Sequence, residues 1–272
     1  GTSMSCPGVA GTIGQLYEAY RDINAGADPK SGLIKASILN TGEDLGNPGP
    51  DFIYGWGRIN ARRAYKTLLE NNYIFDSISQ TENESFFINV PSGTKEVRIM
   101  LYWTDYEGST SASIALVNDL NLVVTDPAST TFEPWVLDPT PNATNLSADA
   151  VRGVDILNNM EQVTISDPIM GSYEINIDGL SIPEGPQEYY IVYEIIEDEI
   201  VVTYPNGGEG ISSNSTSIIR WDASPGTQDF TLDYTIDEGA TWVPINTAGP
   251  NDRDYSWLAP NTTSGLARLR VT

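Results

Sequence analysis

A serine near the start of the chain lies among residues that could support nucleophilic catalysis. The sequence opens with the string GTSMSCPGVAG, residues 1–11, and apolar residues then recur at helical spacing at Val9, Ile13 and Leu16. A serine hydroxyl becomes an effective nucleophile only beside a base. At a helix start the backbone N–H of Ser3 would be free to donate to an oxyanion, and the helix dipole would favour the negative charge. The alternative is that Ser3 is simply a helix N-cap.

The sequence limits which base could serve this serine. The chain contains no histidine, so it cannot supply a histidine base. Lys30 is the lysine nearest to Ser3 in sequence, which makes a Ser–Lys pair the rival arrangement. The single cysteine, Cys6, excludes an intrachain disulfide framework and a CxxC zinc site. We expect Cys6 to be a small packed residue rather than a reactive thiol.

A second group of residues carries oxygen ligands. Asp119 and Asn121 flank Leu120, so both are predicted to lie on the same face of a strand. Ligands that are all oxygen suit a hard cation, calcium above all. The alternative is that these side chains cap turns and hold strands together through hydrogen bonds. Further oxygen ligands from neighbouring loops would be Asp105, Asp155, Asn158, Asn159 and Glu161.

The charge of the chain excludes some functions and suggests three domains. The 272 residues include 37 Asp and Glu against 14 Lys and Arg, a formal net charge of −23. Such a chain will not track a nucleic-acid backbone, which needs clustered basic residues. No uncharged apolar run approaches ~20 residues, so we expect no membrane span. Residues 76–199 hold 22 acidic and 3 basic residues, net −19, which predicts domains at 1–75, 76–199 and 200–272.

The apolar pattern agrees with this division. Residues 1–75 have helical periodicity; Pro29 is predicted to open a second helix, and Asn60 to cap a third over 61–70. From about residue 74 the period becomes 2, which predicts a helical segment followed by two all-β sandwiches of jelly-roll or Ig-like type. Because the sequence stops within a predicted strand, we expect the last module to be truncated. The predicted strands lie around residues 97–103, 120–124, 173–177, 189–195, 218–221, 230–236 and 267–271.

The opening string resembles the nucleophile motif of the subtilisin-like serine proteases (subtilases, peptidase family S8), Gly-Thr-Ser-Met-(Ala/Ser)-x-Pro-x-Val-Ala-Gly. Residues 51–61, DFIYGWGRINA, resemble the same family's Gly-x-Gly-x-(Ile/Val)-(Asn/Asp)-Ala segment. The resemblance implies that residues 1–75 are the C-terminal helical part of an α/β catalytic domain with Ser3 as nucleophile. The catalytic Asp and His and the oxyanion Asn would come from an upstream segment. Gly8 stands where many members have a His that is outside the triad.

Residues 76–199 resemble the β-sandwich that follows the catalytic domain in many bacterial subtilases, similar in build to the proprotein-convertase P domain. The matching strings are LYWTD at 101–105, LVNDLNL at 116–122, GVDILNNME at 153–161 and GPQ at 185–187. The resemblance implies that this domain packs on the catalytic domain and supports its folding or stability. It also supports calcium, although the family often has Asp where this chain has Asn121.

Residues 200–272 resemble a bacterial Ig-like or fibronectin-like module. The string YPNGGE at 204–209 carries the resemblance, and TIDEGATW at 235–242 also matches the Asp-box. We interpret the Asp-box as a hairpin turn with a tryptophan packed beneath it. We expect Trp221, Trp242 and Trp257 to be core residues; carbohydrate binding is the alternative if they share an exposed face.

These observations give two hypotheses. The first is the nucleophile-bearing fragment of a secreted or cell-surface bacterial serine endopeptidase, acting on protein or peptide substrates, inert without its upstream segment and holding structural calcium. The second is a non-catalytic secreted β-sandwich binding or adhesion protein that carries a relic protease segment. An upstream sequence with the family's Asp and His motifs would favour the first.

Overall fold

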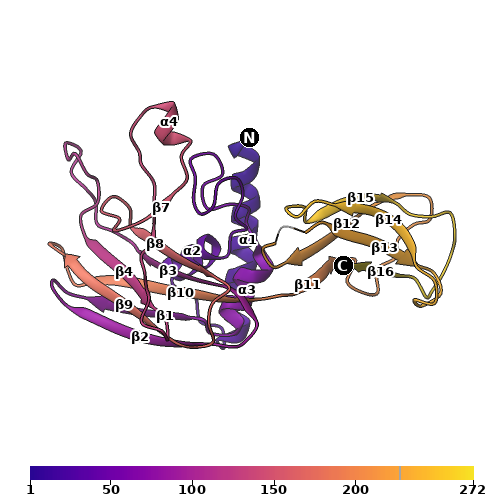
Figure 1. Ribbon diagram of the computed structural model, residues 1–272, viewed down its shortest axis with the longest axis horizontal. Coiled ribbons are helices and arrows are strands. Elements are labelled where there is room, and N and C mark those ends of the chain that lie inside the picture. The colour runs from indigo at the N-terminus through magenta and orange to yellow at the C-terminus, as the bar shows by residue number, and fades with distance from the viewer. Residues whose placement is uncertain (227) are drawn as a thin grey trace. The chain divides into compact units, whose positions relative to one another are not determined.

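The chain is mostly β-structure with few helices, as the sequence predicts. The computed structural model describes residues 1–226 and 228–272. They form two compact units, Gly1–Ile195 and Ile196–Thr272, shown in Figure 1 and described separately below. The predicted boundary at residue 75 falls inside the first unit.

Three helices open the first unit. They are α1 (Thr2–Ile23), α2 (Ser31–Asn40) and α3 (Ala61–Leu69). The predicted cap of the third helix is confirmed, because the Asn60 side chain accepts a hydrogen bond from the Arg63 N–H at 3.0 Å. A short fourth helix, α4 (Ala143–Leu146), lies in a later loop. None of the helices described is both long enough and apolar enough to cross a membrane.

Two four-stranded antiparallel sheets make the sandwich of the first unit. Their orders are β1-β10-β3-β8 and β2-β9-β4-β5, and a small β6-β7 ladder lies beside them (Figure 1). The alternation seen in the sequence sends every second residue of these strands into a shared core, which includes Val97, Ile99, Leu101 and Trp103 of β3. The strands are β1 (Tyr73–Ile78), β2 (Asn83–Val90), β3 (Thr94–Trp103), β4 (Asp119–Thr125), β5 (Thr131–Phe132), β6 (Trp135–Val136), β7 (Val151–Arg152), β8 (Met160–Ser166), β9 (Gly171–Ser181) and β10 (Gln187–Glu197).

The helices cover the other face of the first sheet. Leu33 of α2 and Leu68 of α3 are fully buried in a second core, which Tyr102 of β3 and Tyr190 of β10 complete from the sheet. Every residue of β3 from Val97 to Trp103 is therefore buried, although the strand alternates in sequence. The helical part and the sandwich thus share a core.

The second unit is a smaller sandwich of two three-stranded antiparallel sheets, β11-β12-β15 and β14-β13-β16. Its core is built around Trp221 and Leu232, and the rings of Trp221 and Phe230 meet edge to face at 5.4 Å. The strands are β11 (Ile200–Tyr204), β12 (Thr216–Ala223), β13 (Phe230–Thr235), β14 (Val243–Ala248), β15 (Asp254–Leu258) and β16 (Arg268–Val271).

The Asp-box is a hairpin turn between β13 and β14, as predicted. Asp237 accepts hydrogen bonds from the Thr235 hydroxyl at 2.5 Å and from the Thr241 N–H and hydroxyl at 2.9 and 2.5 Å. Gly239 supplies the positive φ that the turn needs, +96°. Of the three tryptophans, only Trp221 is buried; Trp242 and Trp257 are half-buried, and the Arg270 guanidinium lies over the Trp242 ring at 4.2 Å.

Candidate functional site

Ser3 lies in the first turn of α1 with its side chain exposed. The N–H groups of Met4 and Ser5 donate to the Gly1 carbonyl at 2.9 and 3.3 Å. The Ser3 N–H precedes these donors, so it belongs to the first-turn amides that have no acceptor within the helix. Within residues 1–226 and 228–272 the Ser3 hydroxyl likewise has no hydrogen-bond partner. Both groups are free to meet a substrate at the positive end of the helix dipole.

The second half of α1 holds this turn in place. Leu16 is buried in the core beneath the helices, with Ile13, Tyr17 and Tyr20 packed against it, whereas residues 1–8 are exposed. Cys6 is among the exposed residues, so the expectation that it is packed is wrong for this structure. Pro7 lies inside the helix and has no N–H to offer the Ser3 carbonyl, which loosens the turn beside the serine. The helix therefore presents Ser3 at an open end.

The rival base is engaged elsewhere. Lys30 forms an ion pair with Glu188, and its ammonium group lies 4.5 Å from the centre of the Phe75 ring. These contacts argue against a Ser–Lys pair.

The second family-like string builds a tight loop before α3. The Asp51 carboxylate accepts backbone N–H groups of Asn47, Ile53 and Tyr54 at 3.2, 2.7 and 2.6 Å. Burial acts to raise the pKa of Asp51, but these three donors outweigh it and leave the pKa lowered. Gly57 has φ +95°, and a Cβ there would lie 2.0 Å from the Glu43 carbonyl oxygen, so only glycine fits.

Three of the predicted oxygen ligands present unpaired atoms. Glu161 on β8 is fully buried; its Oε2 accepts the Leu122 N–H at 2.6 Å, while its Oε1 has no partner among the described residues. Asp119 and Asn121 lie on one face of β4, as predicted, and the Oδ1 atom of each is buried and also unpaired within that part of the chain. Buried polar atoms without a protein partner are rare, and a water molecule or a cation can satisfy them.

The remaining predicted ligands are engaged in hydrogen bonds. Asp105 accepts the N–H groups of Val117 and Asn118 at 2.7 and 2.9 Å. Asp155 accepts the Leu157 N–H at 2.8 Å and the side-chain amide of Asn158 at 2.7 Å. The Asn159 side chain donates to the Trp103 carbonyl at 2.6 Å. For these residues, the structure matches the turn-capping alternative.

Negative charges accumulate around the unpaired oxygens. Burial, with the charges of Asp155 and Asp105, raises the pKa of Asp119 to about 6. Burial, with the charges of Asp155 and Asp119, raises the pKa of Glu161 well above its usual value. The carboxylates repel one another, and a bound cation would relieve this repulsion.

The residues fit a calcium ion only with help from non-carboxylate ligands. Among the described residues, no three His, Cys, Asp or Glu side chains converge tightly enough to form a metal site alone. The amide oxygen of Asn121 belongs to the unpaired set, and calcium accepts amide, carbonyl and water oxygens among its six to eight ligands.

The sequence analysis missed a buried amide network at this end of the sandwich. The Asn118 side chain donates to Gln187 Oε1 at 2.7 Å and to the Glu184 carbonyl at 2.6 Å, and Trp103 Nε1 donates to the Asn118 carbonyl at 3.0 Å. The family-like strings contain all three residues, Trp103, Asn118 and Gln187. Their presence in these strings was the one feature of the sequence that could have marked them as a group.

Comparison with known proteins bears on the first helix. Residues 1–57 match the sequence model of Peptidase S8, the Subtilase family. The chain carries a subtilase segment at its N-terminal end. The matched residues include Ser3 and the whole first string, and the match ends at Gly57, inside the second string at 51–61.

The relatives of the chain are much longer proteins. A serine protease/ABC transporter B family protein, tagA, of Dictyostelium discoideum is 25% identical over 179 residues, which are 62% of this chain and 10% of that protein. An extracellular serine protease of Serratia marcescens is 31% identical over 100 residues, 34% of this chain and 9% of that protein. Serotype-specific antigen 1 of Mannheimia haemolytica is 36% identical over 64 residues, 24% and 6% of the two chains. The chain spans about a tenth or less of each relative and is related to serine proteases.

The solved structures that match this chain resemble it only distantly. A lipase, BlEst2 of Bacillus licheniformis in its propeptide form, matches 74% of this chain and 40% of its own at 12% identity and a TM-score of 0.28. A two-domain fibronectin type-III segment of chicken tenascin matches 70% of this chain and 99% of its own at 9% identity and a TM-score of 0.19. Scores this low carry no argument about the fold.

Proposed function

We propose that this chain is the nucleophile-bearing C-terminal part of a secreted serine endopeptidase of the subtilase type. The observation that carries the proposal is the position of Ser3, exposed in the free first turn of α1 with its N–H unbonded. The match of residues 1–57 to the subtilase family supports it.

In this proposal the Ser3 oxygen attacks the carbonyl carbon of a peptide bond. A histidine from the upstream segment takes the hydroxyl proton, and the Ser3 N–H with an upstream Asn stabilises the oxyanion. The amine leaves with a proton returned by the histidine, and water then hydrolyses the acyl-Ser3 ester. The chain alone lacks the base, so it is inert.

The sandwich of residues 76–195 has a supporting role in this proposal. Tyr102, Tyr190 and Val192 of its first sheet pack in the core beneath the three helices α1, α2 and α3. The helix that carries Ser3 therefore rests on the sandwich through Leu16. A calcium ion bound to Asp119, Asn121 and Glu161 would stabilise this support, without touching the reacting atoms.

A fluorophosphonate probe tests the catalytic proposal. We expect negligible labelling of the isolated 272-residue chain and strong labelling of Ser3 when the upstream segment is present. Ser3→Ala should abolish that labelling, whereas Ser5→Ala, on the same turn, should retain it. Strong labelling of Ser3 in the isolated chain, or none in the whole protease, would contradict the proposal.

A further inference from the structure

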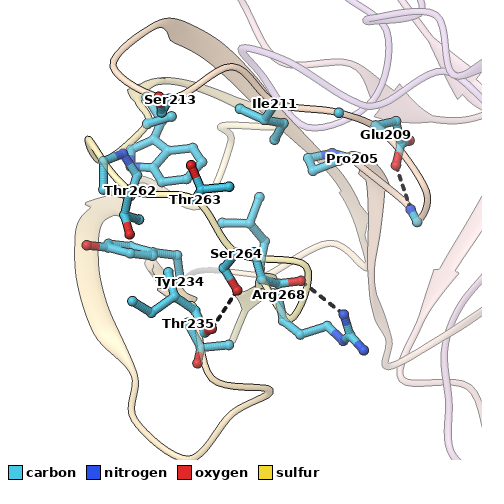
Figure 2. Close-up of a pocket in the computed structure, with 18 of the residues that line it drawn as sticks. Pro205, Glu209, Ile211, Ser213, Tyr234, Thr235, Thr262, Thr263, Ser264 and Arg268 are labelled. Carbon is cyan, nitrogen blue, oxygen red and sulfur yellow. Dashed lines mark hydrogen bonds between the residues drawn. The ribbon is translucent and has the colours of Figure 1, made fainter.

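A groove of about 760 Å³ lies within the second unit. Figure 2 shows Tyr234 and Thr262 on one side of it and Pro205 and Ile211 on the other. Its volume falls in the range of small-molecule sites, roughly 300–1,000 Å³. The groove lies outside residues 1–57 and has no part in the proposed chemistry of Ser3.

Two aromatic rings line the groove together. Tyr234 of β13 and Trp257 of β15 are half-buried, and their ring centroids are 5.4 Å apart with the planes tilted by 43°. Rings at this distance are in contact, so no side chain of a ligand can insert between them. The two rings therefore present a joint surface to the groove and not a slot.

The polar side chains beside these rings are neutral and unengaged. Within residues 1–226 and 228–272, no hydrogen-bond partner is found for the Tyr234 hydroxyl, the Trp257 indole N–H or the hydroxyls of Thr262 and Thr263. Each hydroxyl can both donate and accept a hydrogen bond, and the indole N–H can donate one. A ligand in the groove would find both kinds of partner.

The two charged residues that line the groove in the described part of the chain are already engaged. The Glu209 carboxylate accepts the N–H groups of Asn206 and Gly207 at 2.9 and 2.8 Å. Arg268 pairs with Glu238 at 3.3 Å. The groove is therefore suited to a neutral ligand and not to an ion.

A glycine-rich stretch lines the same groove. Gly207 and Gly208 have φ values of +127° and +86°, so the backbone conformation itself requires glycine at both positions. Gly210 has no positive φ, and nothing lies within 4 Å of the position that a Cβ would take. Neither conformation nor packing among the described residues explains this glycine, whereas a ligand that approaches the main chain does.

We propose that this groove binds a neutral oligosaccharide. A sugar ring has an apolar face of weakly positive C–H groups, which packs on the negative face of an aromatic ring. Its rim carries hydroxyls that donate and accept hydrogen bonds. The joint surface of Tyr234 and Trp257 matches the apolar face, and the hydroxyls of Thr262 and Thr263 match the rim. This binding function goes beyond the proposed protease activity and does not depend on it.

An extended proline-rich peptide is the poorer occupant. Such peptides dock in grooves lined by aromatic side chains, where their proline rings insert between the aromatic rings. The contact between Tyr234 and Trp257 closes that space.

Calorimetric titration of the 272-residue chain with neutral cello-, malto-, chito-, xylo- and manno-oligosaccharides tests the proposal. We expect at least one series to bind saturably, with the same affinity in low and high salt because no charge takes part. Trp257→Ala should weaken this binding at least about tenfold. Trp242→Ala is the matched control, because Trp242 is also half-buried but lies outside the groove. Gly210→Leu should weaken binding by a similar factor without lowering the thermal midpoint.

Three results would overturn the proposal. One is the absence of saturable binding by every series at millimolar concentration. Another is binding that both Trp257→Ala and Gly210→Leu leave unchanged, because the sugar would then lie elsewhere. The third is binding of oligoproline in place of the sugars, lost in Trp257→Ala, which would assign the groove to peptides. Should Trp257→Ala fail to fold, Gly210→Leu, at an exposed position, decides the outcome.

Discussion

Arg63 of α3 and Glu194 of β10 form a buried bidentate ion pair between the helical part and the sandwich. The Nε–Oε1 and Nη2–Oε2 distances are 2.5 and 2.6 Å, and both side chains are less than 10% exposed. Two parallel charge-assisted bonds fix both position and orientation. This pair and the shared core beside it fasten the helical part to the sandwich.

Removing one partner of this pair should be costly. Glu194→Leu or Arg63→Met breaks this buried ion pair, and we expect either to lower the free energy of unfolding by about 3–5 kcal/mol. The double variant Arg63→Met/Glu194→Leu should recover most of that loss. Urea unfolding of the four proteins measures the effect, and a double variant as unstable as the sum of both singles would refute it.

Gly32 on α2 should not tolerate a methyl group. A Cβ there would lie 2.2 Å from Cε2 of Tyr190, whose ring is buried in the second core. Overpacking of this kind costs about 1–3 kcal/mol, so Gly32→Ala should lower the thermal midpoint. Gly8→Ala on α1 is the matched control, because nothing lies within 4 Å of its Cβ position and alanine favours the helix. Equal effects of the two changes would contradict this account.

Calcium should stabilise the first unit through the unpaired oxygens. At a hundred times its Kd a ligand adds about 2.7 kcal/mol, so the thermal midpoint should rise with calcium and fall with chelator. Glu161→Gln and Asp119→Asn should weaken the response, whereas Asp149→Asn, an exposed acid of the same unit, should keep it. A thermal midpoint that does not change with millimolar calcium would argue against the proposed calcium site.

The Asp-box turn should be sensitive to acid. Hydrogen bonds from Thr235 and Thr241 lower the pKa of Asp237 to about 2, from 3.8. A carboxyl whose pKa is lower in the folded state stabilises the fold above pH 4 and loses that contribution as the pH falls towards 2. In urea unfolding between pH 5 and 2.5, the native chain should lose more stability than Asp237→Asn. An equal loss in both would show that the turn does not depend on this charge.

The fold was predictable where the signal is local. The Asn60 cap, the strand periods and the Asp-box turn depend on neighbouring residues, and the structure confirms them. The predicted start of α2 was less accurate, because the helix begins at Ser31, two residues after Pro29. The burial of β3 on both faces was not predicted, because α2, more than 50 residues earlier in the chain, packs against its second face.

For the candidate metal site too, the sequence predicted one part and the tertiary structure decided the other. Residue types suggested oxygen ligands, but they could not tell which oxygens would be free. The carboxylate oxygens of Asp105 and Asp155 accept hydrogen bonds from neighbouring N–H groups. Asp119, Asn121 and Glu161 each have one side-chain oxygen without a hydrogen-bond partner among the described residues. Only the packing of β4 against β8 makes that distinction.

The sequence by itself determined the place of Ser3, because a short string sets it at a helix start and local backbone rules then leave its N–H without an acceptor in the helix. It also determined the acidic character of residues 76–199 and the alternation of the strands. The tertiary structure alone decided that the helical part and the sandwich share one core. That outcome depends on contacts between residues far apart in the chain, such as Arg63 and Glu194, which no local pattern encodes.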